Sequence, residues 1–211
     1  MHISWLGQSA FKIETKTPLK EEVSILINPY NLPKSDLPRN LKSDLVLLTN
    51  GKENTITLSG EPFIISTPGE YEIQGVMVYA FQVPTENEKD KPQLIFHFET
   101  ELMSLTFLGA FQGKLTDEMI DKLGLVDIVL LPVGGKNVLS ADEANNLVGQ
   151  IEPRVVIPHS FSLPNKNDGY EPVDKFAKLL GQKDGEWLPK LKIVKRDLPQ
   201  EETKLVLLNK A

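Results

Sequence analysis

The stretch DLVLLTNGKENT, residues 44–55, joins a run of apolar residues to a polar loop. The apolar run, Leu45 to Leu48, is typical of a strand that is buried on both faces. The loop contains Asn50-Gly51, which is the favoured pair for a type I′ turn, so a simple β-hairpin is one interpretation. The other interpretation is a buried strand that ends in a functional loop at the edge of a sheet.

A similar stretch occurs later in the chain, because DLVLLTNG from Asp44 is followed by DIVLLPVGG from Asp127. Both stretches predict a buried strand that ends at a loop. Short runs rich in β-branched and aromatic residues, separated by turn residues, dominate the first half of the chain. We expect strands at 3–6, 10–13, 23–27, 45–49, 55–58, 63–66, 71–73, 76–83, 93–99, 102–108, 128–131, 155–157, 191–194 and 205–208. The charged segment 85–92 is expected to be a solvated hairpin tip.

Helix signals occur only in the second half. Thr116 is a plausible N-cap for a helix over 117–123, and Ser140 with Glu143 forms a capping box for a helix that must stop before Pro153. A third helix is expected to start at 171–172 and to end at Gly181, with one apolar face. That face comprises Val173, Phe176, Leu179 and Leu180. Many strands with three helices predict two sheets with helices outside them, in one domain over 1–211.

The composition excludes several classes of protein. The chain has 211 residues, a net charge of −6 and no cysteine, so disulfides, thiolate metal sites and cysteine nucleophiles are ruled out. An acidic chain without a basic stripe is not expected to bind nucleic acid. No apolar run is long enough to span a membrane, and the first residues lack the pattern of a signal peptide. We therefore expect a cytoplasmic protein with no membrane partner.

Six segments resemble, in their order along the chain, the metallo-β-lactamase superfamily. The similarity is to its compact bacterial branch of zinc-dependent hydrolases related to L-ascorbate-6-phosphate lactonase. The segments are ISWLGQSAFKI at 3–13, ILINPY at 25–30, PGEYEIQGV at 68–76, FLGA at 107–110, LPVGG at 131–135 and VIPHSF at 156–161. The resemblance implies an α/β (α+β) fold, a four-layer αββα sandwich in which the loop at 49–55 is the metal-binding loop.

The resemblance also implies that the usual metal ligands are missing. Where the family has Thr-His-x-His-x-Asp-His, this chain has Asn50, Lys52, Asn54 and Thr55. Outside the loop, other residues replace family ligands or stand beside them: Gln8, Asn28, Ala110, Ser160 and the neighbouring His159. Zinc prefers imidazole, thiolate and carboxylate donors. We therefore expect no zinc cofactor, although zinc is usual in the family.

Other candidate groups favour structural roles. Glu70 and Glu72 alternate on one strand and are expected to form a solvated face. Ser9, Ser160 and His159 could suggest a nucleophile with its base, but the chain lacks the G-x-S-x-G elbow. Gly134-Gly135 is expected to be a turn that ends a strand. Trp5 and Phe11 are expected to be in the core and Trp187 to be partly exposed.

Two functions follow as hypotheses. The first is a non-catalytic pseudo-hydrolase whose cleft binds a small polar or anionic ligand or a protein partner. Its lining would be Gln8, Asn28, Asn50, Lys52, Asn54, Glu70 and Ser160. Lys52 would be a buried replacement for the missing cation, paired with Glu70 or Glu53, although a lysine pointing into water is the alternative.

The second hypothesis is a hydrolase of a lactone or phosphoester with one Mg²⁺ or Mn²⁺, whose ligands would be His159, Glu70 and either Glu53 or Asp127. The sequence does not specify an oligomeric state.

Overall fold

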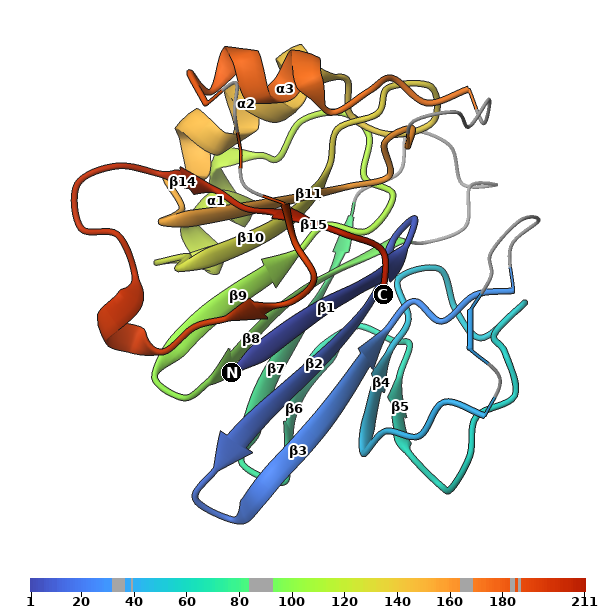
Figure 1. Cartoon of the computed structure of the whole chain (residues 1–211). Helices are drawn as coiled ribbons and strands as arrows, with labels where there is room; N and C mark the ends of the chain where they lie inside the picture. Colours follow the sequence, from blue (N-terminus) through green and yellow to red (C-terminus); the bar gives the residue numbers. More distant parts are fainter. Residues whose placement is uncertain (32–36, 39, 84–92, 164–168, 183–184, 186) are drawn as a thin grey trace.

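Two β-sheets packed face to face form the centre of the computed structural model (Figure 1). The structure describes residues 1–31, 37–38, 40–83, 93–163, 169–182, 185 and 187–211. The expected hairpin tip at 85–92 therefore lies outside the described residues. The α/β sandwich class that the sequence predicts is confirmed.

The six-stranded sheet has the order β13-β1-β2-β3-β4-β5. Its strands are β13 (Leu191–Lys192), β1 (His2–Gly7), β2 (Ala10–Thr17), β3 (Lys20–Ile27), β4 (Leu45–Leu47) and β5 (Phe63–Ile65). The seven-stranded sheet has the order β14-β11-β10-β9-β8-β7-β6. Its strands are β14 (Lys204–Leu205), β11 (Val155–His159), β10 (Ile128–Pro132), β9 (Met103–Phe107), β8 (Gln93–Thr100), β7 (Val76–Val83) and β6 (Gly69–Ile73). A small pair, β12 (Trp187–Leu188) and β15 (Leu207–Leu208), completes the β structure of the described residues.

The fragment DLVLLTNG is not a hairpin. β4 is parallel to both of its neighbours, because Leu45 pairs with Ile25 on β3 and with Phe63 on β5. A parallel pair needs a crossover connection, so the chain after Leu48 must leave the sheet and return at its other end. The hairpin interpretation is therefore wrong, and the segment 48–62 is a crossover. Strand 55–58 is not formed, since Thr55 makes only an isolated bridge to Tyr30.

The helices are α1 (Asp117–Leu123), α2 (Ala141–Ile151) and α3 (Asp174–Leu179), with a 3₁₀ turn η1 (Lys195–Asp197). The first two have the expected caps: the Thr116 hydroxyl accepts from the Met119 N–H, and Ser140 with Glu143 forms the capping box. Figure 1 shows these helices gathered beside β10 and β11.

The third helix starts later than predicted. The backbone at Glu171 is already engaged, because its N–H donates to the Gly134 carbonyl and its carbonyl accepts from the Ser162 N–H. Residues that pair with a loop in this way cannot form the first turn of a helix. The predicted apolar face is only partly buried, since Phe176 is inaccessible but Leu179 is 42% exposed.

The main core lies between the sheets. Trp5 and Phe11 are buried in it, as expected, with Phe96, Phe98 and Phe107 from the seven-stranded sheet. Trp187 is 39% exposed, which confirms the prediction of partial exposure.

A second, smaller core covers the outer face of the six-stranded sheet. Its buried residues include Leu26, Val46 and Leu48, against which Leu41 and Leu58 from loops are packed. This outer layer is therefore built from irregular segments in the part of the chain that the structure describes.

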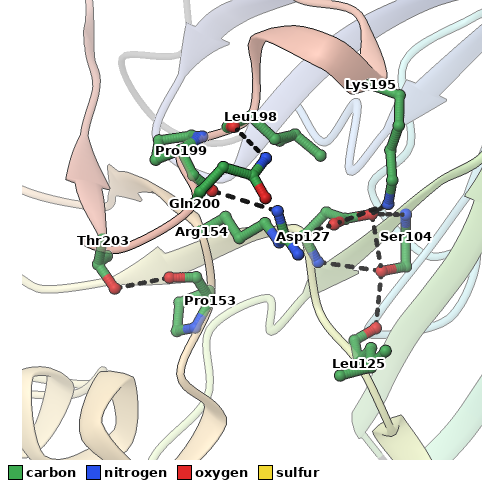
Figure 2. Close-up of polar contacts among 10 residues, drawn as sticks. All are labelled: Ser104, Leu125, Asp127, Pro153, Arg154, Lys195, Leu198, Pro199, Gln200 and Thr203. Atoms are coloured by element: carbon green, nitrogen blue, oxygen red, sulfur yellow. Dashed lines mark hydrogen bonds and ion pairs between the residues drawn. The ribbon is translucent and has the colours of Figure 1, made fainter.

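The recurrence of DLVLL and DIVLL reflects an internal structural repeat. The parallel unit β3-β4-β5 in one sheet corresponds to β9-β10-β11 in the other. At the start of β4, the Asp44 carboxylate accepts from the N–H and hydroxyl of Ser24. At the start of β10, Asp127 accepts in the same way from Ser104, as Figure 2 shows. In both halves a Ser–Asp pair fixes the register of two parallel strands, and the loops at the opposite ends form the candidate site.

Among the described residues, no helix is both long and apolar enough to cross a membrane.

Candidate functional site

A buried hydrogen-bond network lies where β4 ends. The Thr49 N–H donates to Asn28 Oδ1 at 2.9 Å, and Asn28 Nδ2 donates to the Thr49 hydroxyl at 2.9 Å and to the Ser9 hydroxyl at 3.4 Å. The Thr49 carbonyl accepts from Leu94 N–H on β8, so this position also ties the two sheets together. Asn28 and Thr49 are 2% and 0% exposed, so the network is closed to water. Its members are neutral amides and hydroxyls.

Several chain segments reach this network through backbone with positive φ. Gln8, Asn28 and Ser160 have φ of 52°, 46° and 52°, and Gly109 has 61°. For non-glycine residues such a conformation is uncommon and costs about 1 kcal/mol or more each, and it tends to cluster at functional sites. The Ser160 N–H donates to the Gln8 carbonyl at 3.3 Å, and a Cβ on Gly109 would lie 2.8 Å from the Thr49 side chain. The structure thus brings together Gln8, Asn28, Ser160 and the turn that contains Ala110.

The loop after Thr49 turns away from the network. The Tyr30 side chain holds this turn of the loop. The Asn50 N–H donates to the Tyr30 hydroxyl at 2.8 Å, and that hydroxyl donates to the Gly51 carbonyl at 3.1 Å. The side chains of Asn50, Lys52 and Asn54 are exposed. The role of Tyr30 was not predicted from the sequence, although its place at the end of ILINPY, shortly after the buried strand β3, could have suggested that it faces the next loop.

His159 is the last residue of β11, directly before Ser160, and is inaccessible to solvent. Its ring packs against Phe11 and Phe107 with centroid distances of 5.6 and 5.3 Å, and its Nδ1 is 2.9 Å from the Ser160 hydroxyl. Nε2 has no hydrogen-bond partner among the described residues. Burial lowers the pKa of His159 to about 3, although the nearby Leu130 carbonyl opposes the shift. His159 is therefore a neutral group of the core at ordinary pH.

The loop after β10 approaches the same region closely. A Cβ on Gly134 would lie 2.0 Å from the Ser160 carbonyl oxygen, so the backbones touch here. The Val133 N–H donates to the His159 carbonyl at 3.1 Å. The prediction of a strand-ending turn at Gly134-Gly135 is confirmed. The turn holds Ser160 in place, and any side chain at position 134 would overlap the Ser160 carbonyl.

Comparison with known proteins identifies the fold family of this site. The family model described as "Beta-lactamase superfamily domain" matches residues 2–160, from β1 to the end of the Ser160 segment. The chain belongs to the metallo-β-lactamase superfamily. A UPF0173 protein of Pyrococcus abyssi is 26% identical over 185 residues, covering 76% of this chain and 83% of that protein. A protein of Bacillus mycoides named UPF0173 metal-dependent hydrolase is 24% identical over 222 residues, covering 86% and 95%.

Solved structures agree on the fold. A Thermotoga maritima protein, assigned to the Zn-dependent hydrolases of the metallo-β-lactamase superfamily, has a TM-score of 0.82 at 24% identity, covering 98% of this chain and 97% of that one. An isothiocyanate hydrolase from Delia radicum gut bacteria has a TM-score of 0.63 at 11% identity, covering 100% and 97%. At these identities the similarity establishes a metallo-β-lactamase fold.

The alternative metal site is not assembled in this metallo-β-lactamase fold. Glu70 is exposed on the edge strand β6, as expected for a solvated face, and Asp127 lies at the start of β10, the end remote from His159. Glu53 is exposed in the loop after Thr49. Within the described ranges, no group of three or more His, Cys, Asp or Glu could hold a metal ion. Among the described residues, the structure therefore does not bring His159 together with Glu70 and Glu53 or Asp127, and a metal held by this set stays a prediction.

The expectation of a buried Lys52 is also corrected. Its side chain is exposed, and its backbone carbonyl accepts from the Thr55 hydroxyl at 2.8 Å within the loop. The reason is the turn closed by Tyr30, which directs this part of the loop outward. Glu70, the expected partner, is exposed on a different sheet.

Lys52→Ala should therefore change the free energy of unfolding by less than about 0.5 kcal/mol, as expected for a surface residue. Urea denaturation of both proteins would measure this difference. A loss of about 2–4 kcal/mol would instead show a buried ion pair with one partner removed and would contradict the solvated position.

Proposed function

We propose that this chain is a metallo-β-lactamase-fold protein that no longer holds a catalytic metal and acts through binding or assembly. The observation that carries the proposal is the environment of Thr49. Where the metal-binding loop begins, Asn28, Thr49 and Ser9 form a closed network of neutral groups. Such a network has no anionic or imidazole donor for a cation, so its donor set does not fit zinc.

The positions assigned to metal ligands by resemblance support the same conclusion. Asn50 and Asn54 offer amides, Thr55 a hydroxyl and Lys52 an ammonium, which repels cations. Ala110 offers no side-chain atom that could bind a metal, and the Ser160 hydroxyl is hydrogen-bonded to His159 Nδ1. His159 is packed between aromatic rings in the core, whereas Asn50, Lys52 and Asn54 are exposed.

The ligand class that best fits the rim is small and polar or anionic. Lys52 presents an exposed ammonium on the loop, and Asn50 and Asn54 present amides beside it in the sequence. The ammonium of an exposed lysine can donate hydrogen bonds to a carboxylate or phosphate, and the folded protein does not have to bury that charge. A protein partner could present the same groups.

An activity assay with supplied metal tests the proposal. The purified chain would be incubated with Zn²⁺ or Mn²⁺ and with chromogenic lactone and phosphodiester substrates, with and without a chelator. We expect turnover equal to that of buffer containing the same metal. Turnover that increases with protein concentration and is abolished by the chelator would contradict the proposal, since metal-bound hydroxide is the nucleophile of this chemistry.

A further inference from the structure

A groove lies at the opposite end of the seven-stranded sheet from the candidate site. The groove has a volume of about 1040 Å³, and Glu99 near the end of β8 and Asp127 before the start of β10 line it. The candidate site lies at the other ends of the strands of this sheet, near Leu94 on β8 and His159 on β11. Small-molecule sites typically have a volume of about 300–1,000 Å³. Its walls include the C-terminal ends of α1 and α2.

The floor of the groove is the outer face of β7, β8 and β9. Residues that are directly paired across a sheet share a face, and Glu99 pairs with Met77 and Ser104. Two residues further along β8, His97 pairs with Tyr79 and Thr106. The floor is therefore polar, in contrast to the apolar inner face of the same strands.

The cations around the groove are already paired. Figure 2 shows Asp127, whose carboxylate accepts from Lys195 Nζ at 2.8 and 3.0 Å and is 3.5 Å from Arg154 Nε. Lys122 Nζ is 2.7 Å from the Glu118 carboxylate. Lys195 and Arg154 share the one Asp127 carboxylate, so these contacts reduce the positive charge at the groove without cancelling it completely.

The remaining carboxylates leave the groove acidic. Glu72, Glu99 and Glu152 are exposed and, among the described residues, form no ion pair with a lysine or arginine. Glu152 is also the C-cap of α2, where unpaired carbonyls give the helix end a partial negative charge. The groove is thus suited to a positively charged ligand.

A buried histidine, His97, also lines the groove, and one of its ring nitrogens forms no hydrogen bond with the described residues. His97 is only 4% exposed, and its Nδ1 is 2.9 Å from the Thr106 hydroxyl. Its Nε2 has no hydrogen-bond partner among the described residues, and the nearest carboxylate oxygen, on Glu99, is 3.9 Å away. Burial lowers the pKa of His97, although the nearby Glu99 carboxylate opposes the shift, and in the tautomer whose Nδ1–H donates to the Thr106 hydroxyl, Nε2 can accept a hydrogen bond from a ligand.

We propose that this groove binds an organic cation, an ammonium or guanidinium group carried on an aliphatic chain. Glu99 and Glu72 would pair with the charge, His97 Nε2 would accept a hydrogen bond from it, and the Tyr79 ring offers a cation–π contact. The rim supplies apolar surface for the chain, since Leu102 and Leu125 line the groove and are 87% and 92% exposed.

The test uses the full chain with spermidine and agmatine as probes, observed through the ring protons of His97 by NMR. We expect saturable shifts of the His97 signals, with the apparent dissociation constant raised about three- to fivefold in Glu99→Gln or Glu72→Gln and about tenfold in the double variant. Glu61→Gln, which removes the same charge from an exposed position in the crossover before β5, is the matched control and should leave binding unchanged.

Equal weakening in Glu61→Gln and Glu99→Gln would show only a general charge effect and would overturn the proposal. An absence of His97 shifts at millimolar concentrations of both amines and of a lysine- and arginine-containing peptide would also overturn it. Binding of the free amines would identify a small-molecule site, and binding of the peptide alone would identify a basic side chain of a partner as the cation. Neither result depends on metal binding at the candidate site.

Discussion

Gly134→Ala should destabilise the protein by about 3 kcal/mol, because inserting a methyl group into a contact between backbones forces them apart. The added Cβ would lie 2.0 Å from the Ser160 carbonyl oxygen and 2.9 Å from the Tyr170 ring. The backbone oxygen cannot rotate away as a side chain could. Chemical denaturation monitored by circular dichroism would measure the change.

Gly149→Ala is the matched control for this substitution. Gly149 lies within α2, and nothing is within 4 Å of the Cβ that alanine would add. Because glycine disfavours a helix interior relative to alanine, this variant should be stabilised by up to about 1 kcal/mol. If the two variants had the same stability, the close approach of the Gly134 turn to Ser160 would be contradicted.

The stability of the protein should fall steeply as the pH decreases, and His159 should contribute much of the slope. Its pKa is about 3 in the folded protein, while an unfolded histidine has its ordinary pKa of about 6.5. Between these values the unfolded chain binds a proton that the folded chain does not, so stability is present above pH 6.5 and is lost as the pH falls toward 3. For this one group the loss between pH 7 and pH 5 is about 2 kcal/mol.

His159→Leu separates this contribution from the other acid-sensitive groups. The variant cannot take up the proton, so the difference in unfolding free energy between pH 7 and pH 5 should be about 2 kcal/mol smaller than in the parent. At pH 7 the variant should be less stable, since the Ser160 hydroxyl loses its partner. An unchanged pH slope would mean that His159 is accessible to protons in the folded state.

Local sequence signals predicted much of the fold. The capping residues Thr116 and Ser140 fixed the first two helices, since each satisfies backbone groups within a few residues. The repeat of DLVLL and DIVLL indicated two equivalent strands, which the Ser24–Asp44 and Ser104–Asp127 pairs now explain.

Features that depend on distant contacts could not be predicted in this way. The start of α3 is set by the pairing of Glu171 with Gly134, a residue far away in the sequence. The direction of Lys52 depends on Tyr30, whose hydroxyl closes the loop from another strand end. The residue types at the candidate site can be read from the sequence, but the hydrogen bonds between Asn28 and Thr49 depend on how the parallel strands β3 and β4 are paired.

The metal content of the purified protein tests the central claim most directly. The chain would be purified without chelator, incubated with an equimolar amount of Zn²⁺, passed through gel filtration and analysed by elemental mass spectrometry. Because neutral amides, hydroxyls and an ammonium stand where zinc ligands are expected, we predict far less than one zinc per chain after the column. Zinc retained at about one per chain or more would contradict the account.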